Sequence, residues 1–213
     1  MNVDEGLDGD APVSAHSSGR ETLRHDAAEY VRELIFSGEL KPGRRIDQDR
    51  LALKLGVSKL PIREALITLK AEGLVEGMAR RGAFVAPLRV LDIEDHYQIY
   101  GLLSGLAARR AATAISSEEI GELERIVDKM SSAAPESFEL RHSLHRQFHS
   151  IVNRAGGSRR LRAAIRDAAE SIPSRLYSKQ RGQSDEALAE HRRIIACLRA
   201  QDADGASRET AAH

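Results

Sequence analysis

Histidines are the residues in this chain whose spacing most directly suggests chemistry. Six of the eight lie beyond residue 90, and His145 and His149 are four residues apart in a helical pattern. That spacing stacks both imidazoles on one face of an α-helix, where both can reach one metal ion. His191 and His213 continue the apolar stripes of two later predicted helices, so we expect them to point inward. Four inward imidazoles from three helices are typical of a metal cage.

Two other interpretations of these histidines remain open from spacing alone. A lone histidine on an apolar helix face is usually a hydrogen-bonded core residue. Three or four histidines also suit a metalloenzyme with an open coordination position, although no HExxH motif or glutamate base at helical spacing accompanies His145 and His149.

Upstream, residues 50–85 show the pattern of helix, tight turn, helix and basic β-hairpin. Gly56 can take the left-handed conformation that ends the first helix, and Ser58 stands where a hydroxyl would cap the second. Pro61 falls in the first turn, where a missing N–H costs little. Apolar residues at three- and four-residue spacing face the core, which leaves Lys59 and Arg63 on the surface. This order predicts a helix-turn-helix that reads DNA.

A basic wing and a local excess of positive charge support the DNA-binding interpretation. The expected strands, residues 74–76 and 83–85, flank a loop with Arg80, Arg81 and Gly82 that can contact phosphates or the minor groove. The whole chain balances 32 basic against 32 acidic residues, whereas residues 40–90 hold eleven Lys and Arg against five acids. The alternative, a solvated basic face of an ordinary helical domain, does not account for this asymmetry.

The length of 213 residues allows one or two domains, and the helical patterns predict a mainly α protein of two. We expect a disordered arm over residues 1–21, a winged helix-turn-helix with three helices and a β-hairpin over 22–90, and an all-α helical bundle over 91–213. The bundle helices are expected near 92–113, 117–132, 136–154, 158–180, 185–200 and 203–213.

The chain has a single cysteine, Cys197, and no apolar run long enough to cross a membrane or to form a signal peptide. An intramolecular disulfide is excluded. We therefore expect a cytoplasmic protein with no membrane partner.

The run LGVSKLPIREAL, followed by L-x-AEGLVE and RRG-x-FVA, resembles the winged-helix domain of the GntR family of bacterial transcription regulators. The resemblance covers residues 22–88. It implies that Ser58, Lys59, Pro61 and Arg63 lie at the major-groove end of the recognition helix, with Arg81 and Gly82 in the wing.

The chain departs from that family at two positions. Lys59 stands where arginine is usual, and a lysine lacks the bidentate fork of an arginine. Asp49 occupies a position where many members carry a basic contact residue. We expect Arg45 or Arg50 to make the contacts usually made from position 49.

The later phrases His145-x-x-Phe148-His149, Glu190-His191-x-x-Ile194-Ile195 and Asp202-x-x-x-Ala206 with His213 resemble the FCD domain of the FadR-like branch. This resemblance implies that His145, His149, His191 and His213 bind a divalent metal, the first position being usually Asp. It also implies a pocket for a carboxylate effector.

The sequence also predicts which metal ion the four histidines prefer and which residues contact the effector. Four neutral imidazoles favour borderline ions, with Zn or Ni foremost, over Mg or Mn. His142 is an alternative ligand or a partner of one. Tyr100 and Ser104 stand where FCD domains commonly place Arg and Glu, and with Arg175 they are the candidate effector contacts.

Together these patterns predict a transcription regulator and not an enzyme. A homodimer would bind palindromic operator DNA, and a small organic or sugar acid in the metal-containing domain would control its affinity. The alternatives are a metalloregulator that senses the ion itself and a histidine-ligated metalloenzyme.

Overall fold

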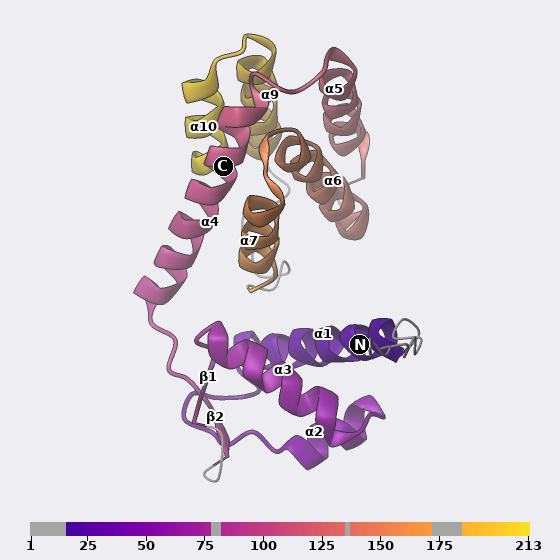
Figure 1. Cartoon of the computed structure of the whole chain (residues 1–213), viewed down its shortest axis with the longest axis vertical. Helices are drawn as coiled ribbons and strands as arrows, with labels where there is room; N and C mark the ends of the chain where they lie inside the picture. Colours follow the sequence, from indigo (N-terminus) through magenta and orange to yellow (C-terminus); the bar gives the residue numbers. More distant parts are fainter. Residues whose placement is uncertain (1–15, 78–81, 135–136, 172–184) are drawn as a thin grey trace, which may run out of the picture. The chain divides into compact units, whose positions relative to one another are not determined.

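The computed structural model describes residues 16–77, 82–134, 137–171 and 185–213. It divides into two compact units, Met1–Pro87 and Leu88–His213, and each is described by itself (Figure 1). The described residues form nine helices and one two-stranded antiparallel sheet, which confirms the predicted mainly α fold. No helix in these ranges combines the length and apolar character needed to cross a bilayer.

The N-terminal unit is built on three helices, α1 (His16–Phe36), α2 (Gln48–Leu55) and α3 (Lys59–Ala71). Helix α3 packs against both α1 and α2. The residues that join α1 to α3 follow helical spacing, and each is almost fully buried: Ala27, Val31, Ile35, Ile62, Leu66 and Leu69.

Helix α1 begins at His16, so it includes the last six residues of the arm expected over residues 1–21. Residues 1–15 lie outside the described part of the chain. Arg20, Glu21 and Leu23 are good helix formers and no proline interrupts them, so the helix extends toward the N-terminus.

The turn between α2 and α3 confirms one predicted signal and corrects another. Gly56 ends α2 with a left-handed φ of 65°. Ser58 occupies the N-cap position of α3, but its hydroxyl makes no capping hydrogen bond. Pro61 is the third residue of α3, and it has no N–H for that hydroxyl to accept.

The wing consists of β1 (Val75–Gly77) and β2 (Ala83–Val85), paired antiparallel with Val75 opposite Val85. Residues 43–46 run along the other edge of β2, where the Ile46 amide donates to the Ala83 carbonyl at 2.9 Å. Gly82 has a φ of 88°, and a Cβ there would lie 2.9 Å from the Arg45 Nε. Glycine therefore lets the Arg45 side chain lie against the base of the wing.

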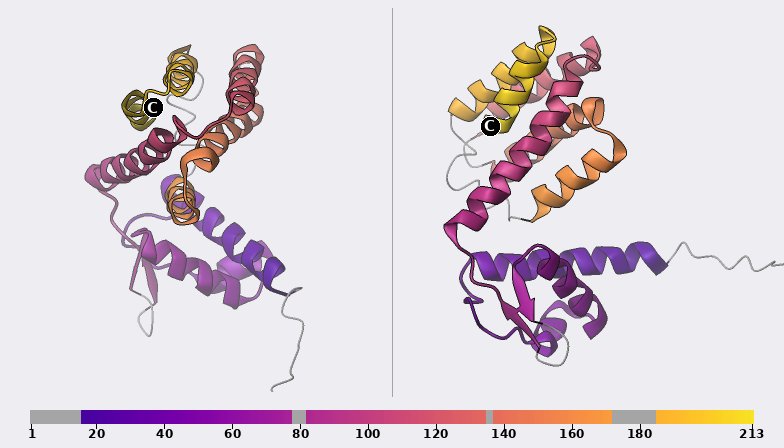
Figure 2. Two further views of the ribbon diagram at one scale, coloured as in Figure 1. Left: turned by 45° about the horizontal axis from the view of Figure 1, so that its top comes forward. Right: turned by 60° about the vertical axis from the view of Figure 1, so that its left-hand side comes forward.

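The second unit is a bundle in which α4 packs against α6, α7 and α10, while α9 packs against α5 and α10 (Figure 2). Its core centres on the fully buried Phe148 with Leu123, Ile194 and Leu198. The helices are α4 (Val90–Ala111), α5 (Ser117–Ser132), α6 (Phe138–Gly156), α7 (Arg159–Glu170), α9 (Asp185–Arg199) and α10 (Ala203–Ala212).

Most of these helices lie within two residues of their expected limits. The exception is α7, expected over 158–180, which ends at Glu170 with Ser171 as its C-cap. The remainder of that prediction, residues 172–180, falls outside the described residues.

Small residues on α4 let α10 approach it closely. A Cβ on Gly101 would lie 2.9 Å from the Ala211 carbonyl oxygen, and one on Gly105 would lie 2.9 Å from that of Ser207. A larger residue at either position would push α10 away. This approach holds α10 against the bundle, and His213 directly follows its last residue.

A buried ion pair fastens α1 to the end of α3 in the N-terminal unit. The Arg32 guanidinium donates to both carboxylate oxygens of Glu72 over 2.8–3.2 Å, and the Arg32 side chain is only 4% exposed. A protein with such a buried pair is usually little more stable than one with two apolar residues in its place. Removal of only one partner, however, leaves the other charge poorly solvated and destabilises the fold.

We expect Arg32→Ala to lower the stability of this unit by about 2 to 3 kcal/mol, less than for a fully buried pair because Glu72 is partly exposed. Hydrogen exchange of α1 and α3 amides measures the effect locally. The control is Arg199→Ala in the second unit, which breaks the exposed pair with Glu124 and should cost that unit less than about 1 kcal/mol by hydrogen exchange of α5 and α9 amides. Equal effects of the two variants would contradict the assignment.

Candidate metal centre and DNA-binding surface

The structure brings the four predicted metal-ligating histidines together. His145 and His149 lie one turn apart on α6, His191 comes from α9, and His213 follows α10. One nitrogen from each ring lies within 4.8 Å of the others. A tetrahedral zinc site with bonds of about 2.0 to 2.1 Å separates its ligand atoms by roughly 3.3 Å, so small side-chain rotations close the site around an ion.

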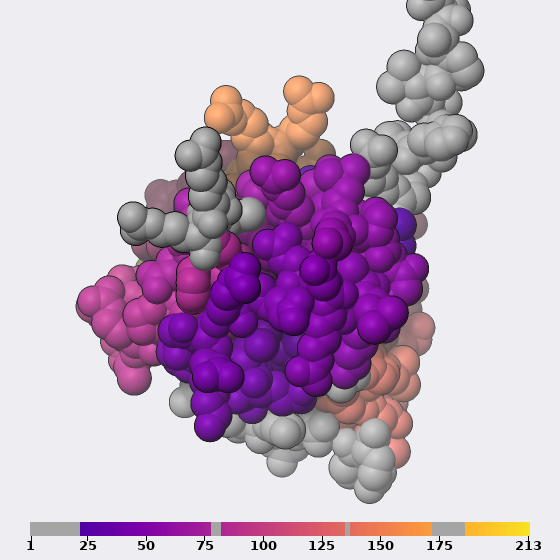
Figure 3. Space-filling view, turned by 90° about the horizontal axis from the view of Figure 1, so that it is seen from below, coloured from indigo at the N-terminus to yellow at the C-terminus, as the bar shows by residue number. Residues whose placement is uncertain are grey.

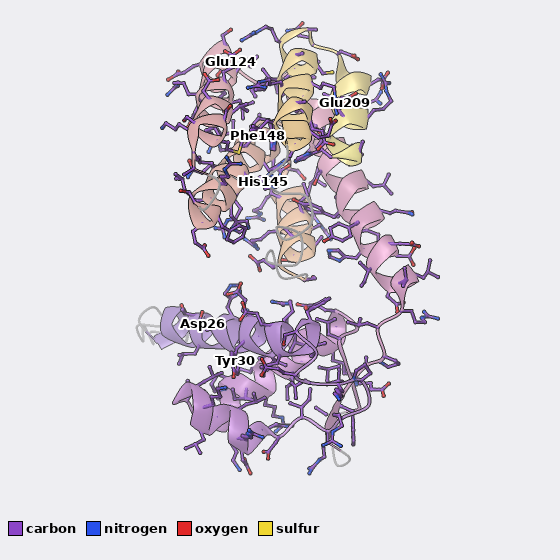
Figure 4. All side chains as sticks on the ribbon, turned by 180° about the vertical axis from the view of Figure 1, so that it is seen from behind. Asp26, Tyr30, Glu124, His145, Phe148 and Glu209 are labelled. Atoms are coloured by element: carbon purple, nitrogen blue, oxygen red, sulfur yellow. The ribbon has the colours of Figure 1, made fainter. Side chains whose placement is uncertain are left out.

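The cluster is set into the core of the bundle. His191 is 2% exposed and His149 is 9% exposed. The Phe148 ring meets the His191 ring edge to face at 4.5 Å, and the rings of His149 and His213 stack at 5.1 Å. In Figure 4 the labelled His145 and Phe148 mark this interior region. Water is therefore largely kept from the imidazole nitrogens.

Hydrogen bonds to Nδ1 orient two of the four rings. His191 Nδ1 lies 2.6 Å from the Ala187 carbonyl oxygen, and His213 Nδ1 lies 2.7 Å from a Glu190 carboxylate oxygen. Each acceptor requires a proton on Nδ1, which leaves a lone pair on Nε2. Both Nε2 atoms are buried and have no hydrogen-bond partner among the described residues. A metal ion is the partner that suits such lone pairs, and the Glu190 contact is the type that orients ligating histidines.

The surroundings of His145, His149 and His191 favour the neutral imidazole that metal ligation requires. Burial lowers the pKa of His145 and His149 well below the ordinary value, and neighbouring rings of the cluster add to the shift. Burial also lowers the pKa of His191 from 6.5 to about 4. At neutral pH these three rings are therefore available as ligands.

The other residues expected around this site have different surroundings. His142 stacks on Phe138 at 5.7 Å and is not one of the four convergent rings. Tyr100 packs beside Leu161 and Ile165, and burial raises the pKa of its phenol. The Ser104 hydroxyl oxygen is buried and makes no hydrogen bond of regular geometry in the described chain. Arg175 lies outside the described residues.

Sequence reasoning missed two polar residues here. Glu190 precedes His191, but its contact is with His213, 23 residues away, and no local spacing rule predicts that pairing. Thr210 lies one turn before His213, and its buried hydroxyl has no partner within the described ranges. The signal available in the sequence is a polar residue, Thr210, on the apolar stripe that leads to His213.

Most of the residues predicted to contact DNA from the N-terminal unit are exposed to solvent. Arg45, Arg50, Lys59 and Arg63 are exposed. Figure 3 looks onto this unit, with residues 25–75 in indigo to purple. Arg81 lies outside the described residues.

Pro61 requires a correction, because its ring is buried. It faces inward with Ile62 and supports the start of α3, so it offers no surface for direct contact with DNA. Leu60 and Ile67, which the sequence did not single out as contacts, are 47% and 55% exposed. They lie three and four residues from Arg63 on the outer face of α3.

Both halves of the chain match known families. Residues 23–85 match the bacterial regulatory proteins of the gntR family, and residues 95–213 match the FCD domain. The chain belongs to the GntR family of regulators and carries an FCD domain. The family consists of DNA-binding transcriptional regulators and not of enzymes, in agreement with the sequence-based expectation.

Relatives of this GntR regulator carry the same general description. An uncharacterised HTH-type transcriptional regulator of Mycobacterium tuberculosis is 31% identical over 75% of this chain, and the alignment spans 64% of that relative, just under two thirds. The uncharacterised HTH-type regulator YdhC of Bacillus subtilis is 28% identical over 86% of this chain and 84% of its own length.

A solved structure shares the fold. Escherichia coli McbR/YncC superimposes with a TM-score of 0.61 at 20% identity, covering 93% of this chain and 92% of that one. GntR regulators bind operator DNA and FCD domains bind small molecules, and FCD domains can bind metals. The histidine cluster of this chain is a site that could hold one.

The buried imidazoles predict an acid-sensitive metal-free state. The unfolded chain takes up protons as the pH falls below 6.5, while folded His191 stays neutral until about 4. The unfolded state then binds more protons, so stability falls with pH over this window and is independent of these groups above it. Between about pH 6.5 and 5 most carboxylates remain ionised, so histidines dominate the change.

Urea midpoints of protein stripped with a chelator measure this loss. His191→Phe removes one contributor and should shallow the decline, whereas replacement of the more exposed His142 by Phe should change it less. A midpoint that stays level or rises as the pH falls through this window would contradict the assignment.

Proposed function

We propose that this GntR regulator binds palindromic operator DNA as a homodimer, and that an anionic effector bound at a divalent ion in the FCD domain controls its DNA affinity. The observation that carries the proposal is the set of four convergent imidazoles, two of them with buried Nε2 atoms that have no hydrogen-bond partner among the described residues. The proposed ligands are His145, His149, His191 and His213.

The chemistry of the ligand set supports Zn or Ni as the ion. Imidazole nitrogen suits borderline metals, whereas Mg and Mn prefer carboxylate and carbonyl oxygen. Glu190 is proposed to fix the orientation of His213 from outside the ligand set.

The net charge of the proposed site supports an anion as effector. Four neutral ligands leave the full double charge of the ion inside the bundle, and a carboxylate would compensate it. The Thr210 hydroxyl on α10 is buried and lacks a hydrogen-bond partner in the described chain. Thr210, the buried Ser104 on α4 and Tyr100, one helical turn before Ser104, are the proposed effector contacts. An organic or sugar acid offers both the carboxylate and the hydroxyl groups that this set would bind.

An exposed apolar row on α4 supports the homodimer. Ile99, Leu102 and Leu106 are 55%, 71% and 38% exposed, and their spacing places them along one face of the helix. A contiguous apolar row of this kind usually marks an interaction surface, and a two-fold axis would let the row of a second copy cover it. A two-fold dimer also accounts for a palindromic operator.

A metalloregulator is the second candidate, and the number of ligands favours it. Four histidines complete a tetrahedral site, and a complete site leaves no position for an effector. In that case occupancy of the ion itself would be the signal.

A thermal-shift screen of organic and sugar acids distinguishes the two functions. With zinc-loaded protein we expect a selective acid to raise the unfolding temperature, because a ligand stabilises the state that binds it. The matched control compound is the amide of the same acid, which lacks the negative charge and should have little effect. The same acid should change operator affinity by at least about fivefold, a typical coupling.

The His191→Ala variant and chelated protein serve as protein controls. If the acid stabilises both as strongly as loaded wild-type protein, the effector does not bind through the ion. If zinc alone changes DNA affinity and no acid does, the metalloregulator interpretation replaces the proposed one.

A further inference from the structure

An exposed ion pair joins the two helices of the helix-turn-helix. Lys59 Nζ lies 2.6 Å from Asp49 Oδ1, and both side chains are 71% exposed. Asp49 belongs to the first turn of α2, and Lys59 is the first residue of α3. In a helix-turn-helix the N-terminal residues of the second helix contact base edges in the major groove. The pair therefore lies at the end of α3 that meets DNA.

Stability does not account for this pair. Exposed ion pairs contribute little to folding. The two helices are already joined by a three-residue turn and by direct packing of α2 against α3, with Leu51 and Ile62 buried. An acid on a surface that approaches phosphates also weakens DNA binding through repulsion. A carboxylate at this place is thus costly for affinity unless it contacts a base.

The pair offers a donor and an acceptor side by side. A G·C base pair presents the complementary order in the major groove, with O6 and N7 of guanine as acceptors next to the N4 amino group of cytosine as donor. Lysine commonly donates to guanine O6 or N7, and aspartate accepts from cytosine N4. An A·T pair would place the thymine O4 acceptor and a methyl group beside the carboxylate.

We propose that Asp49 and Lys59 act together as a specificity-determining unit that reads one G·C pair in each half-site. Lys59 donates to the guanine and Asp49 accepts from the cytosine. The inference rests on the operator-binding part of the proposed function and is independent of the metal and the effector.

The charges of Asp49 and Lys59 predict an effect on DNA binding that distinguishes a base-reading pair from a merely structural one. Because Asp49 neutralises Lys59, the unit adds no net attraction for phosphates. Removal of the carboxylate should strengthen binding to unselected DNA while it weakens discrimination at one base pair. Affinity and specificity then change in opposite directions.

The test uses the full chain and a library of short duplexes with a randomised centre, sequenced before and after binding. Wild-type protein should enrich a palindrome with a G·C pair at one position of each half-site. Asp49→Asn should reduce the preference at that position about five- to tenfold. It should also bind a duplex without the enriched sequence about two- to threefold more tightly.

Three further variants sharpen the assignment. Lys59→Ala should lose the preference at the same position and bind the unselected duplex more weakly. Asp49→Glu keeps the carboxylate and should retain the preference. Glu33→Gln, on the exposed side of α1, also removes one negative charge from the N-terminal half of the chain but leaves the Asp49–Lys59 pair intact. It should leave the preference unchanged.

The outcomes separate this inference from the function on which it rests. An unchanged preference in Asp49→Asn, a loss spread evenly over all positions, or a loss at an A·T pair would each overturn the inference while operator binding stands. If wild-type protein enriches no palindrome, both the inference and the dimeric operator-binding proposal fail.

Discussion

The FCD unit of this regulator is constrained by the burial of four imidazoles at one junction of helices. Two Nδ1 atoms are held by Ala187 and Glu190, so the corresponding Nε2 lone pairs face the interior without partners in the described chain. A buried acceptor without a partner destabilises a folded protein. A compensating ligand at this point would remove that cost, and a divalent ion suits all four nitrogens.

The rest of the unit is arranged around that requirement. Small residues on α4 admit α10 at close range, which carries His213 to rings from α6 and α9. An ion bound there would connect elements that are up to 68 residues apart in sequence, from His145 to His213. Any ligand of the ion would then act on the packing of three helices together, which is the kind of differential contact that a regulated response needs.

Local sequence patterns predicted most helices and part of the histidine cluster. The features that they did not predict depend on tertiary contacts between elements. Helical periodicity placed most helices and the His145 and His149 pair, because both depend on spacing within one element. The left-handed Gly56 followed from its lack of a Cβ. By contrast, Pro61 was expected at the DNA surface although its ring is buried, since a position near the start of a helix does not specify which way the side chain faces. The contacts of Glu190 with His213 and of Asp49 with Lys59 cross between elements, so no spacing rule reveals them.

The central claim is that the histidine cluster is a metal centre, and metal content measures it most directly. Protein purified without chelator and analysed by elemental mass spectrometry should contain about one Zn or Ni ion per chain, and His191→Ala should lose most of it. Glu190→Ala should retain the ligands but lower metal affinity about 10- to 100-fold, as for other carboxylates that orient a ligating histidine. Wild-type protein with no divalent ion above background, even after incubation with zinc and removal of the excess, would contradict the account.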